Sequence, residues 1–164
     1  MKAQFEIRPL EKEDEDFLFE MLYQAIYVPD GVQKPDRSIL KDPSISIYAE
    51  SWGKAGDMGF LAIDSQSLKK TGAAWVRILD GEPRGYGNIG PGIPELGIAV
   101  DYPYRRQGVG RLLMESLLSQ TMTGHETLSL SVQPENPATL FYEELGFMRC
   151  GYSGSSVLMR YDRE

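Results

Sequence analysis

The chain has 164 residues, which is enough for one domain with a substantial apolar core. Its 24 acidic residues outnumber 17 basic ones and give a net charge of −7. This charge argues against a nucleic-acid-binding protein, because such proteins bind phosphates mainly through cations. A single cysteine and a single histidine exclude an internal disulfide and a cluster of cysteine or histidine metal ligands. We therefore expect no bound metal and no nucleic-acid partner.

The apolar residues are also arranged unlike those of a membrane protein. No apolar stretch approaches the roughly 18–20 residues of a membrane-spanning helix. The N-terminal sequence MKAQFEIRPL lacks the long apolar segment of a secretory signal peptide. Together with the lone cysteine, these features predict a cytoplasmic protein without a membrane partner.

The N-terminal third is expected to form one strand followed by helices. The predicted elements are a strand over residues 4–8 that Pro9 ends, an amphipathic helix over residues 14–28, a short helix around Ser38 and a further helical segment over residues 46–53. The acidic run Glu13–Asp16 suits the positive end of a helix dipole, and we interpret it as a solvated helix start rather than a binding site.

The remaining two thirds alternate between strands and helices. The predicted elements are strands over residues 57–64, 72–80, 94–100 and 127–132, helices over residues 108–122 and 136–147, and a final hairpin of residues 147–152 with 155–162. We expect the first of these helices to bury Leu112, Leu113, Leu117 and Leu118, and Gly146 to end the second. This order is typical of a mixed α and β domain rather than an all-β protein or a helical bundle.

Two glycine-rich stretches fit the spacing of nucleotide-binding loops to different degrees. GYGNIG, residues 85–90, fits the pattern G-x-G-x-x-G, but the PGIP that follows contains two prolines and cannot open the helix that a dinucleotide-binding loop requires. We interpret this stretch as a flexible loop between two strands. Whether residues 81–94 close over a substrate stays open at this point.

The second stretch, YRRQGVGRLLM, follows a predicted strand and runs directly into a helix. Gly108 and Gly110 bare the backbone N–H groups at the electropositive end of that helix. Arg105, Arg106 and Arg111 add full positive charges nearby. These features predict a seat for a pyrophosphate, and the alternative is a basic surface turn.

Residues 105–110, RRQGVG, resemble the R/Q-x-x-G-x-G/A signature of the GCN5-related N-acetyltransferases, the GNAT family. The segment NPATLFYEELGF, residues 136–147, is similar to the second conserved block of that family. The two motifs occur in the family's order, and the resemblance covers residues 94–160. It implies an α/β (α+β) fold in which residues 1–164 form a single GNAT-like domain, with a mixed, mostly antiparallel sheet flanked by helices.

The resemblance implies acetyl-CoA as the cosubstrate, without a metal. The residues that would hold its pyrophosphate are Arg105, Arg106, Gln107, Gly108, Val109, Gly110 and Arg111. Its pantetheine arm would run along the strand near Ile98 and Val100 like an added strand, with Asn136 close to the arm or the thioester.

The chemistry implied by the resemblance is direct acetyl transfer to a primary amine. Tyr142 would act as the general acid, because a tyrosine can protonate a leaving thiolate. Glu95 would accept the proton of the amine, and an exposed strand-end acid without this role is an equal alternative. A solvent-exposed amine can also lose its proton without a dedicated base. A backbone N–H near Val100 would stabilise the negative charge that develops on the acetyl oxygen.

The sequence does not identify the acceptor, which the resemblance limits to a small-molecule or peptide amine. Homodimers are common in the family, so a homodimer is possible. The aromatic residues Tyr23, Tyr27, Tyr48, Trp52 and Trp75 could line an acceptor pocket or belong to the core. The alternative function is a non-catalytic acyl-CoA-binding or sensing module on the same fold.

Overall fold

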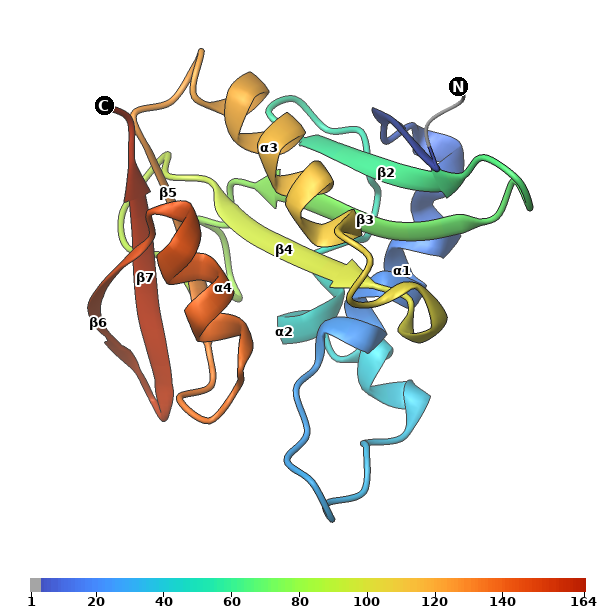
Figure 1. Cartoon of the computed structure of the whole chain (residues 1–164). Helices are drawn as coiled ribbons and strands as arrows, with labels where there is room; N and C mark the ends of the chain where they lie inside the picture. Colours follow the sequence, from blue (N-terminus) through green and yellow to red (C-terminus); the bar gives the residue numbers. More distant parts are fainter. Residues whose placement is uncertain (1–3) are drawn as a thin grey trace.

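A seven-stranded sheet runs through the molecule, and the computed structural model describes residues 4–164 (Figure 1). The strands are β1 (Phe5–Pro9), β2 (Met58–Asp64), β3 (Lys70–Arg77), β4 (Glu95–Val100), β5 (Thr127–Val132), β6 (Met148–Ser153) and β7 (Ser156–Asp162). Their order is β1-β2-β3-β4-β5-β7-β6, and each neighbouring pair is antiparallel except β4 and β5, which are parallel. The predicted mixed, mostly antiparallel sheet is confirmed.

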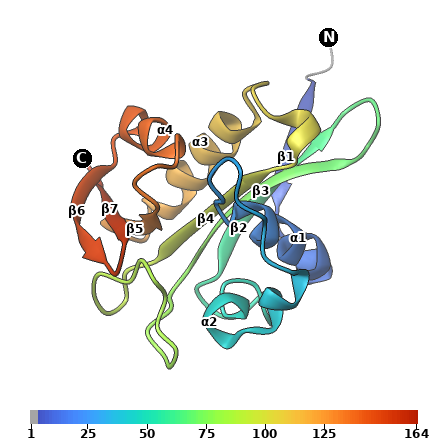
Figure 2. The ribbon, with the colours of Figure 1, turned by 90° about the horizontal axis from the view of Figure 1, so that it is seen from below.

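Helices cover both faces of this sheet. They are α1 (Glu15–Ala25), α2 (Pro43–Ser46), α3 (Val109–Thr121) and α4 (Ala138–Leu145), with short 3-10 helices at Lys12–Asp14, Arg37–Lys41 and Tyr102–Tyr104. Figure 2 shows α1 and α2 on one side of the sheet and α3 and α4 on the other. One apolar core surrounds Trp75 on the α1 side, and a second surrounds Leu113 on the α3 side. Of the helices within residues 4–164, none has the length and apolar character that crossing a bilayer requires.

The helix predicted over residues 46–53 lies further upstream in the structure. Pro43 occupies the first turn of α2, and the Asp42 side chain accepts a hydrogen bond of 2.9 Å from the backbone N–H of Ser44. An acidic N-cap followed by proline favours a helix start at this position. The helix therefore begins at Pro43. It ends at Ser46, and turns follow it.

The interpretation of Glu13–Asp16 as a solvated run is wrong for Asp14, which is only 2% exposed. Its carboxylate accepts hydrogen bonds from Arg8 in β1 and Lys70 in β3, each at 2.8 Å. Burial alone would raise the pKa of Asp14, but the hydrogen bonds from Arg8 and Lys70 outweigh it and hold that pKa well below its usual range. Asp14 therefore ties the start of α1 to two strands.

The buried stripe of α3 differs in part from the prediction. Leu113 and Leu117 are fully buried as expected, whereas Leu112 is 39% exposed. Val109, Met114 and Thr121 are also buried, and Leu118 is half-buried; Val109, Leu113, Leu117 and Thr121 form the central line of the buried face. The spacing of four between these positions follows one helix face, and Leu112 lies off that face.

Candidate active site

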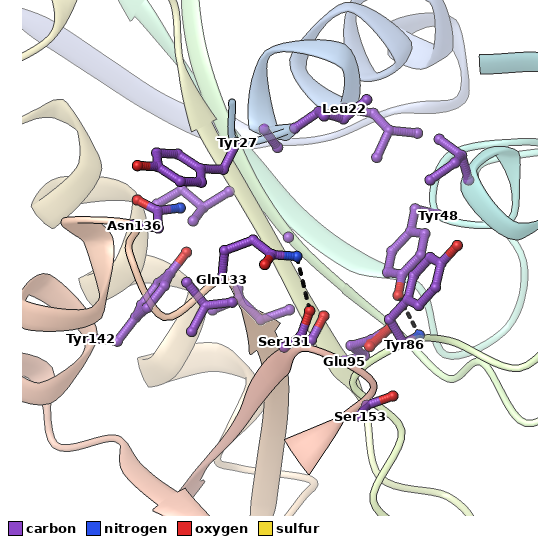
Figure 3. Close-up of a pocket in the computed structure, with 18 of the residues that line it drawn as sticks. Leu22, Tyr27, Tyr48, Tyr86, Glu95, Ser131, Gln133, Asn136, Tyr142 and Ser153 are labelled. Carbon is purple, nitrogen blue, oxygen red and sulfur yellow. Dashed lines mark hydrogen bonds between the residues drawn. The ribbon is translucent and has the colours of Figure 1, made fainter. Parts of the chain in front are cut away.

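A cavity opens where β4 and β5 separate. Glu95 and Ser129 are the one residue pair in register between these strands, while β4 pairs with β3 along its whole length. Among the described strands, the remaining length of β4 therefore has no partner on its β5 side. The cavity has a volume of about 640 Å³, and its walls come from the α1–α2 region, β4, β5, α4 and the β6–β7 turn (Figure 3).

Glu95 stands at one end of this cavity and is only 2% exposed. Its Oε1 atom accepts a short hydrogen bond from the backbone N–H of Gly87. Its Oε2 atom is buried and has no hydrogen-bond partner of good geometry within residues 4–164. The Tyr48 phenol lies next to the same carboxylate (Figure 3) and accepts a hydrogen bond of 2.8 Å from the backbone N–H of Tyr86.

Burial raises the pKa of Glu95 to about 7, although the phenol of Tyr48 and the N–H of Gly87 lower it in part. Burial and the neighbouring carboxylate also raise the pKa of Tyr48, so its hydroxyl stays protonated. A carboxyl group with a pKa near neutrality is suited to accept and release protons under physiological conditions. The reading of Glu95 as an exposed strand-end acid is therefore wrong.

The GYGNIG stretch forms the wall that encloses Glu95. It lies in a loop, as predicted, and hydrogen bonds hold the loop in place, among them one of 3.1 Å from the Tyr86 hydroxyl to Ser44. A Cβ atom added at Gly85 would overlap Oε2 of Glu95, and one added at Gly87 would overlap Oε1. Both glycines are thus needed because the carboxylate occupies the space of their side chains.

Tyr142 enters the same cavity from α4, on the side away from Glu95 (Figure 3). Its half-buried ring packs against Phe141 and Phe147, with ring centroids 5.8 Å apart in each case. Burial raises the pKa of Tyr142 to about 12, so the phenol is protonated at neutral pH. Asn136 also lines the cavity, and its Oδ1 atom accepts a hydrogen bond of 2.9 Å from the N–H of Ala138 at the start of α4.

The residues predicted to bind a pyrophosphate lie at the start of α3. Gly108 is the N-cap residue with a φ of +84°, and Arg106 also has a left-handed φ of +62°. Alternation between left-handed and ordinary backbone turns successive N–H groups toward a common point, which is how anion-binding nests are built. A Cβ at Gly108 would meet nothing within 4 Å, and residues 105–108 are exposed, so this turn is open to solvent.

The side chains of this segment are only partly directed toward an anion. Arg105 donates from Nε to the carbonyl of Val100 at 2.8 Å, and Arg111 forms an exposed ion pair of 3.6 Å with Glu144. Gln107 donates to the carbonyl of Pro103 at 3.1 Å. Arg106 is exposed and has no ion pair within residues 4–164, which leaves its charge available to a ligand.

The structure thus divides the predicted site residues into two groups. Glu95, Ile98, Asn136 and Tyr142 line the cavity together. Val100 is the last residue of β4, and residues 105–111, which include the buried Val109 and the glycine Gly110, follow that strand; none of these residues lines the cavity.

The aromatic residues left open by the sequence also divide. Tyr27, Tyr48 and Trp75 line the cavity, whereas Trp52 is buried in the core and Tyr23 bonds to the carbonyl of Pro35. Sequence reasoning missed Tyr86, Gln133 and the contact of Gly85 and Gly87 with the carboxylate. A glycine pair shortly before a strand that begins with an acid is the signal that could have indicated this contact.

The sequence is similar to known acetyltransferases over part of its length. The model of the acetyltransferase (GNAT) domain matches residues 70–149. Over 52 residues the chain is 48% identical to the [ribosomal protein bS18]-alanine N-acetyltransferase of Escherichia coli K12, a stretch that covers 30% of this chain and 35% of that relative. The chain therefore matches only about a third of the length of this curated relative.

Solved structures share the fold over nearly the whole chain. The ribosomal-protein-S18-alanine N-acetyltransferase of Escherichia coli has a TM-score of 0.65 at 23% identity, covering 96% of this chain and 93% of its own. The PaiA N-acetyltransferase of Thermoplasma acidophilum, in complex with coenzyme A, has a TM-score of 0.69 at 18% identity, covering 98% and 100%. The yncA protein of Salmonella typhimurium, with its cofactor acetyl-CoA, has a TM-score of 0.68 at 16% identity, covering 99% and 95%. At these identities the likeness establishes the fold.

Proposed function

We propose that the chain, whose residues 70–149 match the acetyltransferase (GNAT) domain and whose fold is shared with N-acetyltransferases, transfers an acetyl group from acetyl-CoA to a primary amine by direct attack. The observation that carries this proposal is the joint presence of two features. One is an open cradle of backbone N–H groups at the start of α3, and the other is a cavity that contains both a carboxyl group with a pKa near 7 and a protonated tyrosine. The acceptor would be a small-molecule or peptide amine.

The residues at the start of α3 fit the pyrophosphate of acetyl-CoA. Residues 107–111 would bind it through N–H groups that the first helical turn leaves without partners, and Arg106 would add a full charge. The unpaired edge of β4 at Ile98 would bind the pantetheine arm through backbone hydrogen bonds. When bound, acetyl-CoA would supply the acetyl group as a reactive thioester.

Glu95 and Tyr142 would move the two protons that the reaction requires. The acceptor nitrogen forms a bond to the acetyl carbon while the carbon–sulfur bond breaks. The proton released by the nitrogen goes to Glu95, directly or through one water molecule, because this carboxyl group has an unpartnered oxygen and a pKa near neutrality. Tyr142 donates its phenolic proton to the departing sulfur.

Thermal unfolding with acetyl-CoA, CoA and NAD tests this proposal. A ligand that binds only the folded state stabilises it by about 2.7 kcal/mol at a hundredfold excess over its Kd. We expect stabilisation by acetyl-CoA and CoA but not by NAD, and its loss in Gly108→Glu. Gly31→Glu is the matched control, because Gly31 also has a left-handed φ of +81° and open space around it but lies outside the cradle.

Two results would count against the proposal. Absence of any shift with acetyl-CoA in the wild-type protein would leave the α3 cradle as a basic turn. Binding of acetyl-CoA without CoA release across a broad panel of amines would favour a non-catalytic acyl-CoA-binding module.

A further inference from the structure

The charges around the cavity differ from those of a site built for a zwitterion. Glu95 is the one acidic residue in its lining, and within residues 4–164 no arginine, lysine or histidine lines it. A carboxylate or phosphate placed near Glu95 would thus meet a like charge and no cation. Like charges in a partly desolvated site cost several kcal/mol, whereas an ammonium group beside Glu95 is attracted to it.

Arg77 is the cation nearest to Glu95 in the sheet register, where the two residues pair between β3 and β4. Its guanidinium is bound elsewhere, in an ion pair of 2.8 Å with Asp57 in which both side chains are 4% exposed. It also donates to the carbonyls of Ile47 and Glu50, each at 2.8 Å. Arg77 is therefore fully engaged by the protein and contributes no charge to the cavity.

Three aromatic side chains of the lining have their polar atoms bonded within the protein, although the lining also contains polar residues such as Gln133 and Asn136. The indole N–H of Trp75 donates to the carbonyl of Tyr48 at 2.9 Å. The hydroxyl of Tyr86 donates to Ser44 at 3.1 Å, and that of Tyr27 donates to the carbonyl of Glu135 at 3.3 Å. Since these polar atoms already have partners, the aromatic residues offer apolar contact to a ligand, and Leu22, Ile26 and Ile45 extend this apolar part of the lining.

We propose that the acceptor is a primary amine with an aromatic or apolar group next to it and no carboxylate or phosphate beside the nitrogen. This inference rests on the proposed acetyltransferase function and names the acceptor class of the same site. An arylalkylamine and the first residue of a peptide with an apolar N-terminus share this chemistry. A free amino acid does not, because its carboxylate would lie beside Glu95 without a cation.

The test compares CoA release by the wild-type protein with phenylalanine, phenylalaninamide and phenethylamine. We expect kcat/KM for each analogue that lacks the carboxylate to exceed that for phenylalanine about 100-fold, which is the ratio that a cost of a few kcal/mol produces. The amide is less basic than phenylalanine and phenethylamine is more basic, so amine basicity cannot account for both differences. A peptide that begins with phenylalanine, compared with phenethylamine, distinguishes the two sources of acceptor.

A variant adds an independent readout on the same site. Ser153 lies at the mouth of the cavity at the end of β6 (Figure 3), and Ser153→Arg supplies the missing cation. We expect the preference for phenylalaninamide over phenylalanine to fall to about tenfold or less, because the added guanidinium pairs with the carboxylate. Ser119→Arg on the exposed side of α3 changes the net charge equally and should leave the preference unchanged.

Three results would overturn the inference. Equal use of phenylalanine and phenylalaninamide would show that a carboxylate is tolerated. Failure of all three amines to react, while acetyl-CoA still stabilises the protein, would show that the acceptor class is wrong but leave cosubstrate binding intact. Absence of stabilisation by acetyl-CoA would remove the proposed function and this inference together.

Discussion

Two glycine pairs with the same spacing, Gly85 with Gly87 and Gly108 with Gly110, lack side chains for different physical reasons. At the first pair there is no room, since a Cβ atom would overlap the carboxylate of Glu95. At Gly108 there is room, because nothing lies within 4 Å of an added Cβ atom. Glycine is favoured there because the backbone φ of +84° is left-handed. The first pair packs closely around an acid, whereas a side chain at Gly108 would reach open space.

The comparison shows that glycine spacing alone does not identify a nucleotide-binding loop. The deciding feature is whether the protein itself fills the space above the glycines or leaves it open to a ligand. In the proposed reaction the loop at 85–87 serves proton transfer and the loop at 107–110 serves cosubstrate binding. Variants near each loop should therefore separate the two functions, and the following predictions test that separation.

The largest effect is expected from Glu95→Gln, which removes the acid that the first pair surrounds. General base catalysis contributes about 10²–10⁴-fold, so we expect kcat/KM to fall about 1,000-fold. The pH profile of the wild-type protein should rise with a midpoint near the Glu95 pKa of about 7, and this limb should vanish in the variant. A variant that keeps the wild-type rate and profile would show that Glu95 is not the base.

The same substitution should change how stability depends on pH. The pKa of Glu95 is raised from 4.5 to about 7 in the folded state, so the folded protein binds this proton more tightly than the unfolded chain does. The free energy of unfolding should therefore fall by up to about 3 kcal/mol as the pH rises from about 4.5 to 7. Denaturant titrations across this range should show a smaller fall in Glu95→Gln, and an equal fall in both proteins would contradict the raised pKa.

Gly87→Ala tests whether the first pair is required by packing. The added Cβ would also lie 2.8 Å from the backbone of Leu130 and Ser131, so the loop and the carboxylate must shift. We expect a loss of about 1–3 kcal/mol in the free energy of unfolding from overpacking, and about 100-fold in kcat from the displaced acid. Gly81→Ala in the same loop is the control, because nothing lies within 4 Å of the new methyl group. Equal losses of stability and kcat in Gly87→Ala and Gly81→Ala would show that close packing around Glu95 does not require a glycine at position 87.

Tyr142→Phe removes the phenolic hydroxyl on the side of the cavity away from Glu95. We expect kcat to fall about 100-fold from loss of the proton donor, with unchanged affinity for acetyl-CoA. The limb near pH 7 should persist, because Glu95 is unaltered. Unchanged kcat in steady-state assays would remove Tyr142 from the mechanism.

Tyr48→Phe should produce the smallest change and the most specific one. The phenol of Tyr48 lowers the pKa of Glu95, so its removal should raise the midpoint of the pH profile above 7. We expect a displacement of about half a pH unit to one unit, with little change in the maximal rate at high pH. A downward displacement would show that Tyr48 acts mainly by burying the carboxylate.

Much of the fold could be predicted from the sequence because its determinants are local. Alternation and helical spacing indicated the strands and the long helices, and Gly146 ends α4 with a φ of +107° as expected. The cradle at the start of α3 was also recognisable, since all its residues are contiguous. In contrast, the burial of Asp14 depends on Lys70, which lies 56 residues away in sequence.

The acid and its surroundings could be predicted only in part. Glu95 was identified at the start of its strand, but its pKa depends on Tyr48 from the α2 region and on Gly87 from the loop that precedes β4. These contacts bring together segments that no sequence pattern links. The same holds for the absence of cations from the cavity lining, which becomes visible only when Arg77 is seen to bind Asp57.

The most direct test measures acetyl-CoA affinity by calorimetry and turnover with phenylalaninamide side by side in three proteins. The wild-type protein should bind and turn over, Gly108→Glu should lose binding, and Glu95→Gln should bind with wild-type affinity but lose about 1,000-fold in turnover. This crossed result would show that the two glycine pairs serve cosubstrate binding and proton transfer separately. Wild-type affinity in Gly108→Glu, or full turnover in Glu95→Gln, would contradict that division.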